Sequence, residues 1–80
     1  MQLELYYFDS CPFCQKVTSV IEQLKIQDKI IMKNIHQNQE YAQALVQMNG
    51  GRQVPCLVID GKPMLESADI SQFLQSTFAS

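Results

Sequence analysis

Two cysteines lie two residues apart near the start of the chain, in the segment DSCPFCQKV at positions 9–17. Such a pair serves as a structural disulfide, as half of a metal site, or as a dithiol that exchanges electrons with other thiols. A disulfide between Cys11 and Cys14 would close so short a loop that it would add little stability. The third cysteine, Cys56, makes the count odd and small, unlike the cysteine sets of disulfide-stapled secreted domains. The pair therefore favours redox or metal chemistry.

A closed zinc site is the weaker of these two interpretations. It would need four ligands, and beyond the CxxC pair only Cys56 and the single histidine, His36, are available. A second closely spaced ligand pair, the usual mark of a structural zinc site, is missing. We therefore expect no metal and interpret the pair as a dithiol.

Length and composition describe an ordinary soluble globular domain. The 80 residues suit one domain over residues 1–80, with 46% hydrophobic and 18% charged side chains. The net charge of −2 and the lack of a basic run argue against a nucleic-acid surface. No apolar run approaches the roughly 20 residues of a membrane helix, and the N-terminal MQLEL has no features of an export signal. We therefore expect a cytoplasmic protein, in which a CxxC pair is more often catalytic or metal-binding than structural.

Four short apolar runs predict the strands of a small sheet. The runs favour extended structure and are bounded by turn-forming residues. They lie at residues 3–8, 29–35, 56–59 and 63–65. The last two flank Asp60-Gly61, which is a strong signal for a hairpin turn.

Three helices are predicted between and after these strands. One begins at Pro12, which is tolerated in a first helical turn, and the others follow the cap residues Asn38 and Ser67. The inward faces are predicted from apolar residues at helical spacing: Val17, Val20, Ile21 and Leu24; Tyr41, Ala44, Leu45 and Met48; and Ile70, Phe73 and Leu74. The order β-α-β-α-β-β-α predicts an α/β fold with a four-stranded mixed sheet, whose first two strands are parallel through a right-handed crossover.

The predicted elements place Cys11 between the end of a strand and the start of a helix. Unpaired N–H groups and the helix dipole favour an anion at that point, and thiols there commonly have lowered pKa values. Cys14 lies one turn further along the helix, on the same side. We therefore expect Cys11 to be the exposed nucleophile and Cys14 the resolving thiol.

The segment GRQVPCLVID has a second unusual feature, a proline at the entrance to a strand. Proline interrupts a strand ladder, so Pro55 is either a trans residue at the strand start or a cis residue. A cis bond would turn the Val54 backbone outward, where it could pair with an extended peptide-like ligand. The sequence pattern alone favours trans, because only about 5–6% of X-Pro bonds are cis.

Together, the first strand, SCPFC at a helix start and the segment GRQVPCLVIDGKPMLESADI resemble a glutaredoxin of the thioredoxin-like superfamily. The resemblance covers essentially the whole chain in the same element order. It implies the thioredoxin-like fold, a catalytic Cys11 and Cys14, and a cis proline, which reverses the preference for trans. It also implies a glutathione site that includes Phe13, in place of the family's usual tyrosine, and Gln53, Val54 and Pro55.

The start of the last predicted helix resembles a related family. The segment LESAD, residues 65–69, is closer to the Glu-Ser segment of glutathione transferase N-terminal domains, which share the fold. In both families this segment holds the γ-glutamyl end of glutathione. The resemblance therefore adds Glu66, Ser67 and Ala68 to the glutathione site, and a helix N-terminus does supply N–H donors for a carboxylate.

One position departs from the glutaredoxin pattern. Members of that family generally carry a lysine three residues before the first cysteine, which supports the thiolate and the glycyl carboxylate of glutathione, and this chain has Phe8 there. Arg52 and Lys16 are the nearest candidates to compensate, and each is equally well a solvated surface charge. His36, in a polar loop, is expected to be exposed, and Cys56 to be a small buried hydrophobe.

The resemblance implies a monomeric, glutathione-dependent thiol–disulfide oxidoreductase, with glutathione as co-substrate and no tightly bound cofactor. Its partners would be disulfide-containing or glutathionylated proteins, not nucleic acid or membranes. Two alternatives stay open: a glutathione-ligated iron–sulfur cluster carrier, and a glutathione-binding module akin to a transferase N-terminal domain. Relatives that carry clusters typically lack the motif proline or the second cysteine, and this chain has both.

Overall fold

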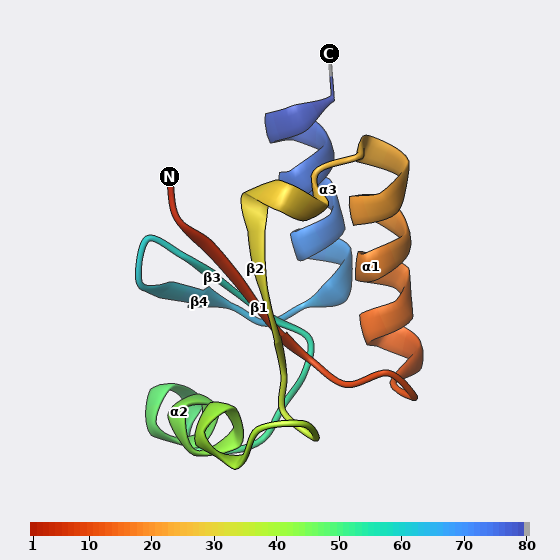
Figure 1. The fold of residues 1–80 in the computed structure, drawn as a ribbon. Helices are drawn as coiled ribbons and strands as arrows, with labels where there is room; N and C mark the ends of the chain where they lie inside the picture. Colours follow the sequence, from red (N-terminus) through yellow and green to blue (C-terminus); the bar gives the residue numbers. More distant parts are fainter. Residues whose placement is uncertain (80) are drawn as a thin grey trace.

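The computed structural model describes residues 1–79 and has the predicted order of elements (Figure 1). Its strands are β1 (Leu3–Tyr7), β2 (Ile30–Asn34), β3 (Cys56–Ile59) and β4 (Lys62–Met64). Its helices are α1 (Pro12–Leu24), α2 (Gln39–Asn49) and α3 (Ser67–Phe78), with a short 3-10 helix, η1 (Gln27–Lys29), before β2. The predicted strand ends are wrong by one residue in β1, β2 and β4, while β3 has the predicted bounds.

The strands form one mixed sheet in the order β2-β1-β3-β4. β1 and β2 pair in parallel through the α1 crossover, whereas β1 with β3 and β3 with β4 are antiparallel. A two-residue turn joins β3 to β4, and its residues Asp60 and Gly61 both have positive φ, at 49° and 88°. Tight hairpin turns of type I′ require positive φ at both positions. The predicted α/β fold with a four-stranded mixed sheet is confirmed.

Helices lie on both faces of the sheet, because side chains alternate along each strand. Leu3 and Leu5 of β1 belong to one core cluster with residues of α1 and α3, which lie side by side (Figure 1). Tyr6 belongs to a second cluster, on the opposite face, with Ala42 and Leu45 of α2. The CxxC segment therefore lies at the end of the α1 layer, and α2 covers the other face.

The helix faces follow the predicted pattern in α1 and α3 and depart from it in α2. The fully buried positions of α1 and α3 include the predicted Val17, Ile21, Ile70 and Leu74, together with Cys14, which was not predicted on the inward face. In α2, Leu45 is buried as predicted and Ala42 is buried without having been predicted. Met48 is 38% exposed, so its predicted place on the inward face is wrong.

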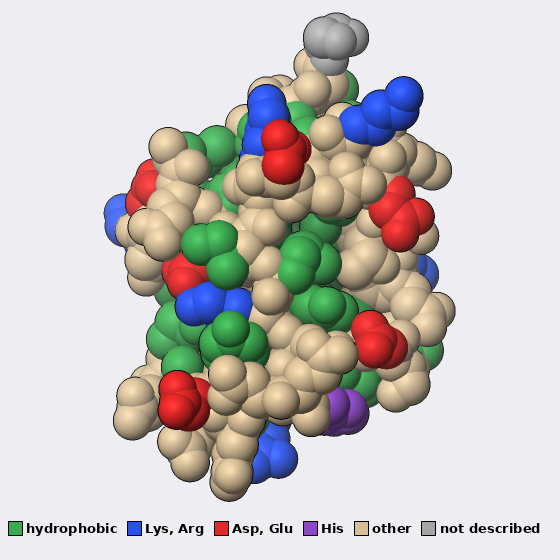
Figure 2. Space-filling view, in the orientation of Figure 1, with side chains coloured by type: hydrophobic (Ala, Val, Ile, Leu, Met, Phe, Trp, Pro, Cys, Tyr) green, Lys and Arg blue, Asp and Glu red, His purple; other side chains and the backbone are tan. Residues whose placement is uncertain are grey.

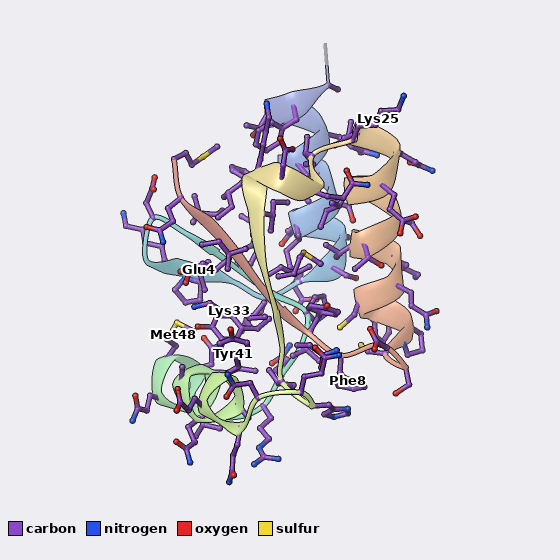
Figure 3. All side chains as sticks on the ribbon, viewed as in Figure 1. Glu4, Phe8, Lys25, Lys33, Tyr41 and Met48 are labelled. Atoms are coloured by element: carbon purple, nitrogen blue, oxygen red, sulfur yellow. The ribbon has the colours of Figure 1, made fainter. Side chains whose placement is uncertain are left out.

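A polar cluster lies where α2 approaches β1 and β2 (Figure 3). Lys33 forms an ion pair with Glu4, and its Nζ lies 5.2 Å from the Tyr6 ring centroid and 5.5 Å from that of Tyr41. The hydrogen bond to Glu4 is the main reason that the pKa of Lys33 is raised. Tyr41 is half-buried beside this cation, and it also packs against the core cluster on the α2 face.

The helix starts differ in how they are capped. Asn38 caps α2 as predicted, because its Oδ1 accepts the backbone N–H of Glu40 at 2.9 Å. The predicted cap of α3 is wrong by one residue: α3 begins at Ser67, and the N-cap position is Glu66, with φ −81° and ψ 127° and no side-chain capping bond. The first amides of α3 therefore have no side-chain acceptor within residues 1–79.

Charged side chains are spread over the face shown in Figure 2, where Lys and Arg are interspersed with acidic and uncharged residues. Hydrophobic side chains are visible in a band across the middle of this face. Within residues 1–79, no helix combines the length and the apolar character that crossing a membrane would require.

Candidate functional site

Cys11 and Cys14 lie at the N-terminus of α1, where the chain leaves β1. Cys11 is the N-cap residue, with extended backbone angles of φ −81° and ψ 117°, and its Sγ accepts the backbone N–H of Cys14 at 3.2 Å. The sulfur thus takes the hydrogen bond that a capping oxygen usually accepts. Cys11 is 6% exposed and Cys14 is 1% exposed. The expectation of an exposed Cys11 is therefore wrong, because its side chain is buried, although Cys11 is the more accessible of the two.

The Cys14 thiol is held in its neutral form. Burial and, after it, the hydrogen bond with Cys11 raise the pKa of Cys14 from 9.0 to about 12. A hydrogen bond with the Phe8 backbone acts in the opposite direction and is the smaller effect. All three cysteines are free thiols. At neutral pH, Cys14 is thus a protonated thiol in contact with Cys11.

A cleft of about 160 Å³ lies next to the CxxC segment and joins three regions that are far apart in the sequence. These regions are the start of α1, the loop before β3 and the segment before α3. The lining residues are Phe13, Gln53, Val54, Pro55, Leu65, Glu66 and Ser67. Every residue predicted to bind glutathione lines the cleft except Ala68, which is exposed next to it in α3. Leu65 was not predicted as a site residue, and its position in the LESAD segment was the available signal.

The peptide bond between Val54 and Pro55 is cis. The family resemblance implied this isomer, and the sequence pattern alone did not. Pro55 is buried, whereas Val54 is half-buried and lines the cleft. An extended ligand in the cleft can therefore reach the Val54 backbone for strand-like pairing.

Phe8 stands where glutaredoxins generally carry a lysine, and it packs against aromatic and apolar neighbours. Its ring stacks on the imidazole of His36, with centroids 4.3 Å apart and planes 16° from parallel. It also packs against the core cluster on the α2 face. His36 is exposed as predicted. The stack itself was missed, because nothing in the sequence connects the residue after β1 with the loop after β2.

Neither basic candidate is among the residues that line the cleft. Lys16 Nζ lies 5.3 Å from the ring centroid of Phe13, which is 56% exposed, so a positive charge is present at one edge of the cleft. Arg52 lines a different cavity of about 370 Å³, together with His36 and neighbouring residues. Cys56 is fully buried, as predicted, with Asn49 Nδ2 at 3.5 Å from its Sγ. In the described part of the chain, no group of three or more Cys, His, Asp or Glu side chains could hold a metal.

The chain matches the family model for the glutathione S-transferase N-terminal domain over residues 5–80. Among solved structures, the trimeric glutathione transferase TDR1 of Leishmania is 29% identical with a TM-score of 0.79, covering 99% of this chain and 17% of that one. The glutathione transferase Omega 3C of Trametes versicolor is 26% identical with a TM-score of 0.79, covering 98% of this chain and 34% of that one. No curated protein sequence matches.

A third structure, an unclassified glutathione transferase of Bombyx mori, has a TM-score of 0.82 at 18% identity and shows the shared fold alone. It is covered over 37% of its length, so this chain spans well under half of each of these three proteins. The resemblance to glutaredoxins is thus confirmed for the thioredoxin-like fold and the link to glutathione, and not for the finer family. This chain belongs to the glutathione S-transferase N-terminal domain family and has its thioredoxin-like fold.

Proposed function

We propose that this domain is a glutathione-dependent thiol–disulfide oxidoreductase that reduces protein disulfides and glutathione mixed disulfides. The observation that carries the proposal is the hydrogen bond from the Cys14 backbone N–H to Cys11 Sγ at the start of α1. An amide donor and the helix dipole both favour a thiolate at this sulfur. The second thiol, Cys14, lies in contact with it and stays protonated.

In the first step, the Cys11 thiolate attacks one sulfur of a disulfide or of a glutathionylated protein. A bond forms between Cys11 Sγ and that sulfur while the original S–S bond breaks, and the other sulfur leaves as a thiolate that takes up a proton. The product is a mixed disulfide on Cys11. The partner proteins are therefore ones that carry accessible disulfides or attached glutathione.

Two routes then break the mixed disulfide and free the group bound to Cys11. In the dithiol route, Cys14 loses its proton and attacks Cys11 Sγ, which forms the Cys11–Cys14 disulfide and releases the bound thiol. In the monothiol route, the thiolate of free glutathione attacks the glutathione sulfur attached to Cys11, which regenerates the Cys11 thiolate and yields glutathione disulfide. The chain would act as a monomer in the cytoplasm, where a CxxC pair is more often catalytic than structural.

We assign bound glutathione to the cleft described above. The Val54 backbone would pair with the tripeptide, and the amides of Ser67 and Ala68 at the start of α3 would bind the γ-glutamyl carboxylate. The Glu66 carboxylate would bind the ammonium group. Phe13, half of whose surface is exposed, would form the wall closest to the cysteines.

The family match supports a second candidate, the glutathione-binding part of a transferase. The match extends over residues 5–80, and the matching solved structures are glutathione transferases several times longer than this chain. In that case the cleft binds glutathione in the same way. The two candidates differ in chemistry, because a transferase joins the glutathione sulfur to an electrophile and needs no covalent bond to Cys11.

One pair of assays separates the candidates. The oxidoreductase should reduce the mixed disulfide of glutathione and β-mercaptoethanol in the presence of glutathione, and the Cys11→Ser variant should not. Conjugation of glutathione to a chloronitrobenzene tests the transferase reaction on the same preparation. Conjugation without disulfide reduction, undiminished in Cys11→Ser, would support the second candidate and contradict the first.

A further inference from the structure

A smaller, third cavity lies beside Cys14 and shares no residue with the proposed glutathione cleft. It has a volume of about 40 Å³, and it is lined by Tyr7, Phe8, Asp9, Cys14, Gln15 and Thr18. About 10–15 Å³ is enough to hold one water molecule when polar partners are present. The cavity therefore has room for water between a buried thiol and the polar groups of the β1–α1 loop.

The dithiol route requires a proton acceptor close to Cys14, and the rest of the site does not supply one. Cys14 must lose its proton before it can attack, since the thiolate is the nucleophile in disulfide exchange. Burial raises the pKa of this thiol to about 12, so a proton acceptor close to it would speed the step. Cys11, the nearest titratable neighbour, cannot accept this proton once its sulfur is bonded to the substrate.

Asp9 is the only carboxylate among the residues that line this cavity, and its position is fixed by neighbours on two elements. Asn34 Nδ2, at the end of β2, donates to Asp9 Oδ2 at 3.4 Å. Asn34 is itself buried and oriented, because its Oδ1 accepts the His36 backbone N–H at 2.9 Å. Gln15 Nε2 donates to the Asp9 carbonyl oxygen at 2.9 Å and ties the loop to α1.

We propose that Asp9 is the proton acceptor for Cys14 in the dithiol route, acting through a water molecule in this cavity. The inference rests on the proposed oxidoreductase function and adds a residue to it. No other aspartate, glutamate or histidine lines the cavity. Tyr7 also lines it, but a neutral phenol is a poor base at neutral pH.

The step moves one proton and replaces one S–S bond by another. The cavity water passes the Cys14 proton to the Asp9 carboxylate, and the Cys14 thiolate attacks Cys11 Sγ in the mixed disulfide. The Cys11–Cys14 bond forms as the bond between Cys11 and the substrate sulfur breaks. The substrate sulfur leaves as a thiolate, and the Asp9 proton returns to it or to solvent. The oxidant is the substrate disulfide, which gains both electrons.

A rapid-mixing experiment observes this step directly. A symmetrical nitrophenyl disulfide releases one coloured thiolate when Cys11 attacks and a second when Cys14 resolves the mixed disulfide. All proteins carry Cys56→Ala, so that each coloured thiolate is assigned to Cys11 or Cys14. In the Asp9→Asn variant, the second release should slow by about 100-fold, the lower end of what general base catalysis contributes, while the first is unchanged. Asparagine keeps an oxygen for Asn34 and loses only the basic carboxylate.

Two matched variants complete the test. Asp28→Asn makes the same chemical change at an exposed site in η1 and should leave both releases unchanged. Cys14→Ser should give the first release alone, and adding Asp9→Asn to it should not alter that release. A second release in Asp9→Asn as fast as in the parent protein would overturn the role of Asp9. A parent protein that gives no second release contradicts the dithiol function itself.

Discussion

Two helix N-termini lie at the cleft that we propose for glutathione, and their first amides are capped in different ways. The first N–H groups of any helix lack partners within the helix. At α1, the protein supplies an acceptor, because Cys11 Sγ receives the Cys14 N–H at 3.2 Å. At α3, the N-cap residue Glu66 makes no side-chain capping bond, and Ser67 faces the cleft.

This difference indicates that the two helix ends have different roles. Each end favours an anion through its free amides and its dipole. In the proposed function, the anion at α1 belongs to the protein and is the Cys11 sulfur. In the same proposal, the α3 position is left for an anion from a ligand, such as the γ-glutamyl carboxylate. α2 contributes no residue to the cleft and has an ordinary cap, Asn38, so it serves as an internal reference.

The largest expected effect concerns the α1 end. Cys11→Ser should abolish activity in every thiol–disulfide assay, because serine caps the helix but is not a comparable nucleophile at neutral pH. Cys14→Ser should keep activity on glutathionylated substrates, since the monothiol route needs one protein thiol and free glutathione. Turnover of a glutathionylated peptide and of a protein disulfide measures both routes. Equal loss in the two variants would show that the assigned roles are wrong.

The second effect concerns the α3 end and glutathione binding. Ser67→Pro removes the first amide of α3, and proline is well tolerated there because the preceding Glu66 already has extended angles. Loss of the hydrogen bond from this backbone N–H to a carboxylate should weaken glutathione binding by about 1.5–3 kcal/mol. Ser67→Ala keeps the amide and removes only the hydroxyl, so its cost should be about 0.5–1.5 kcal/mol.

Calorimetric titration of glutathione into the Cys14→Ser protein, alone and with each Ser67 substitution added, would measure the dissociation constants of glutathione. Equal affinities for the alanine and proline variants would mean that the amide is not part of the ligand site. The proposal that the α3 end binds an anion from a ligand would then be wrong.

Local sequence signals were sufficient for most of the fold. The apolar spacing of α1 selected Val17 and Ile21, and both are fully buried. Asp60-Gly61 fixed the hairpin, because few other residue pairs take positive φ twice in succession. These features depend on residues close together in the chain, and for that reason a pattern in the sequence could identify them.

Features that depend on distant residues were harder to predict. The cis Pro55 needed the family resemblance, since nothing local distinguishes it from a trans proline at a strand start. The Phe8–His36 stack joins the ends of two strands and has no sequence signature. Met48 was misplaced because the buried side of α2 is centred on Ala42 and Leu45, and the apolar spacing in the sequence did not select Ala42. For the site, the sequence predicted the cleft residues and missed Leu65.

The third prediction follows from the neutral thiol at the α1 end. The pKa of Cys14 is about 12 in the folded protein against an ordinary 9.0, so the unfolded chain loses this proton first as the pH rises. The stability that this thiol contributes is therefore complete below about pH 9 and is lost as the pH approaches about 12. Burial raises the pKa of Cys56 as well, so that thiol acts in the same direction.

Urea denaturation of the parent and of Cys14→Ser between about pH 8 and about pH 11 would measure this contribution. The free energy of unfolding of the parent should fall more steeply with pH than that of the variant, and adding Cys56→Ala should make the fall less steep again. Parallel curves for the parent and Cys14→Ser would mean that the thiol ionises alike in the folded and unfolded states.

The smallest expected effect is on the free energy of unfolding. It comes from comparing the start of α2, which a side chain of the protein caps, with the start of α3, which we propose is left for a ligand. Asn38→Ala removes the oxygen that accepts the Glu40 N–H, so the free energy of unfolding should fall by about 1 kcal/mol. Ser67→Ala removes a hydroxyl that caps nothing in α3, and the same quantity should change by less than about 0.5 kcal/mol. Urea denaturation without glutathione measures both. A loss for Ser67→Ala as large as that for Asn38→Ala would show that the hydroxyl does cap α3, and that this helix end is not held open for a ligand.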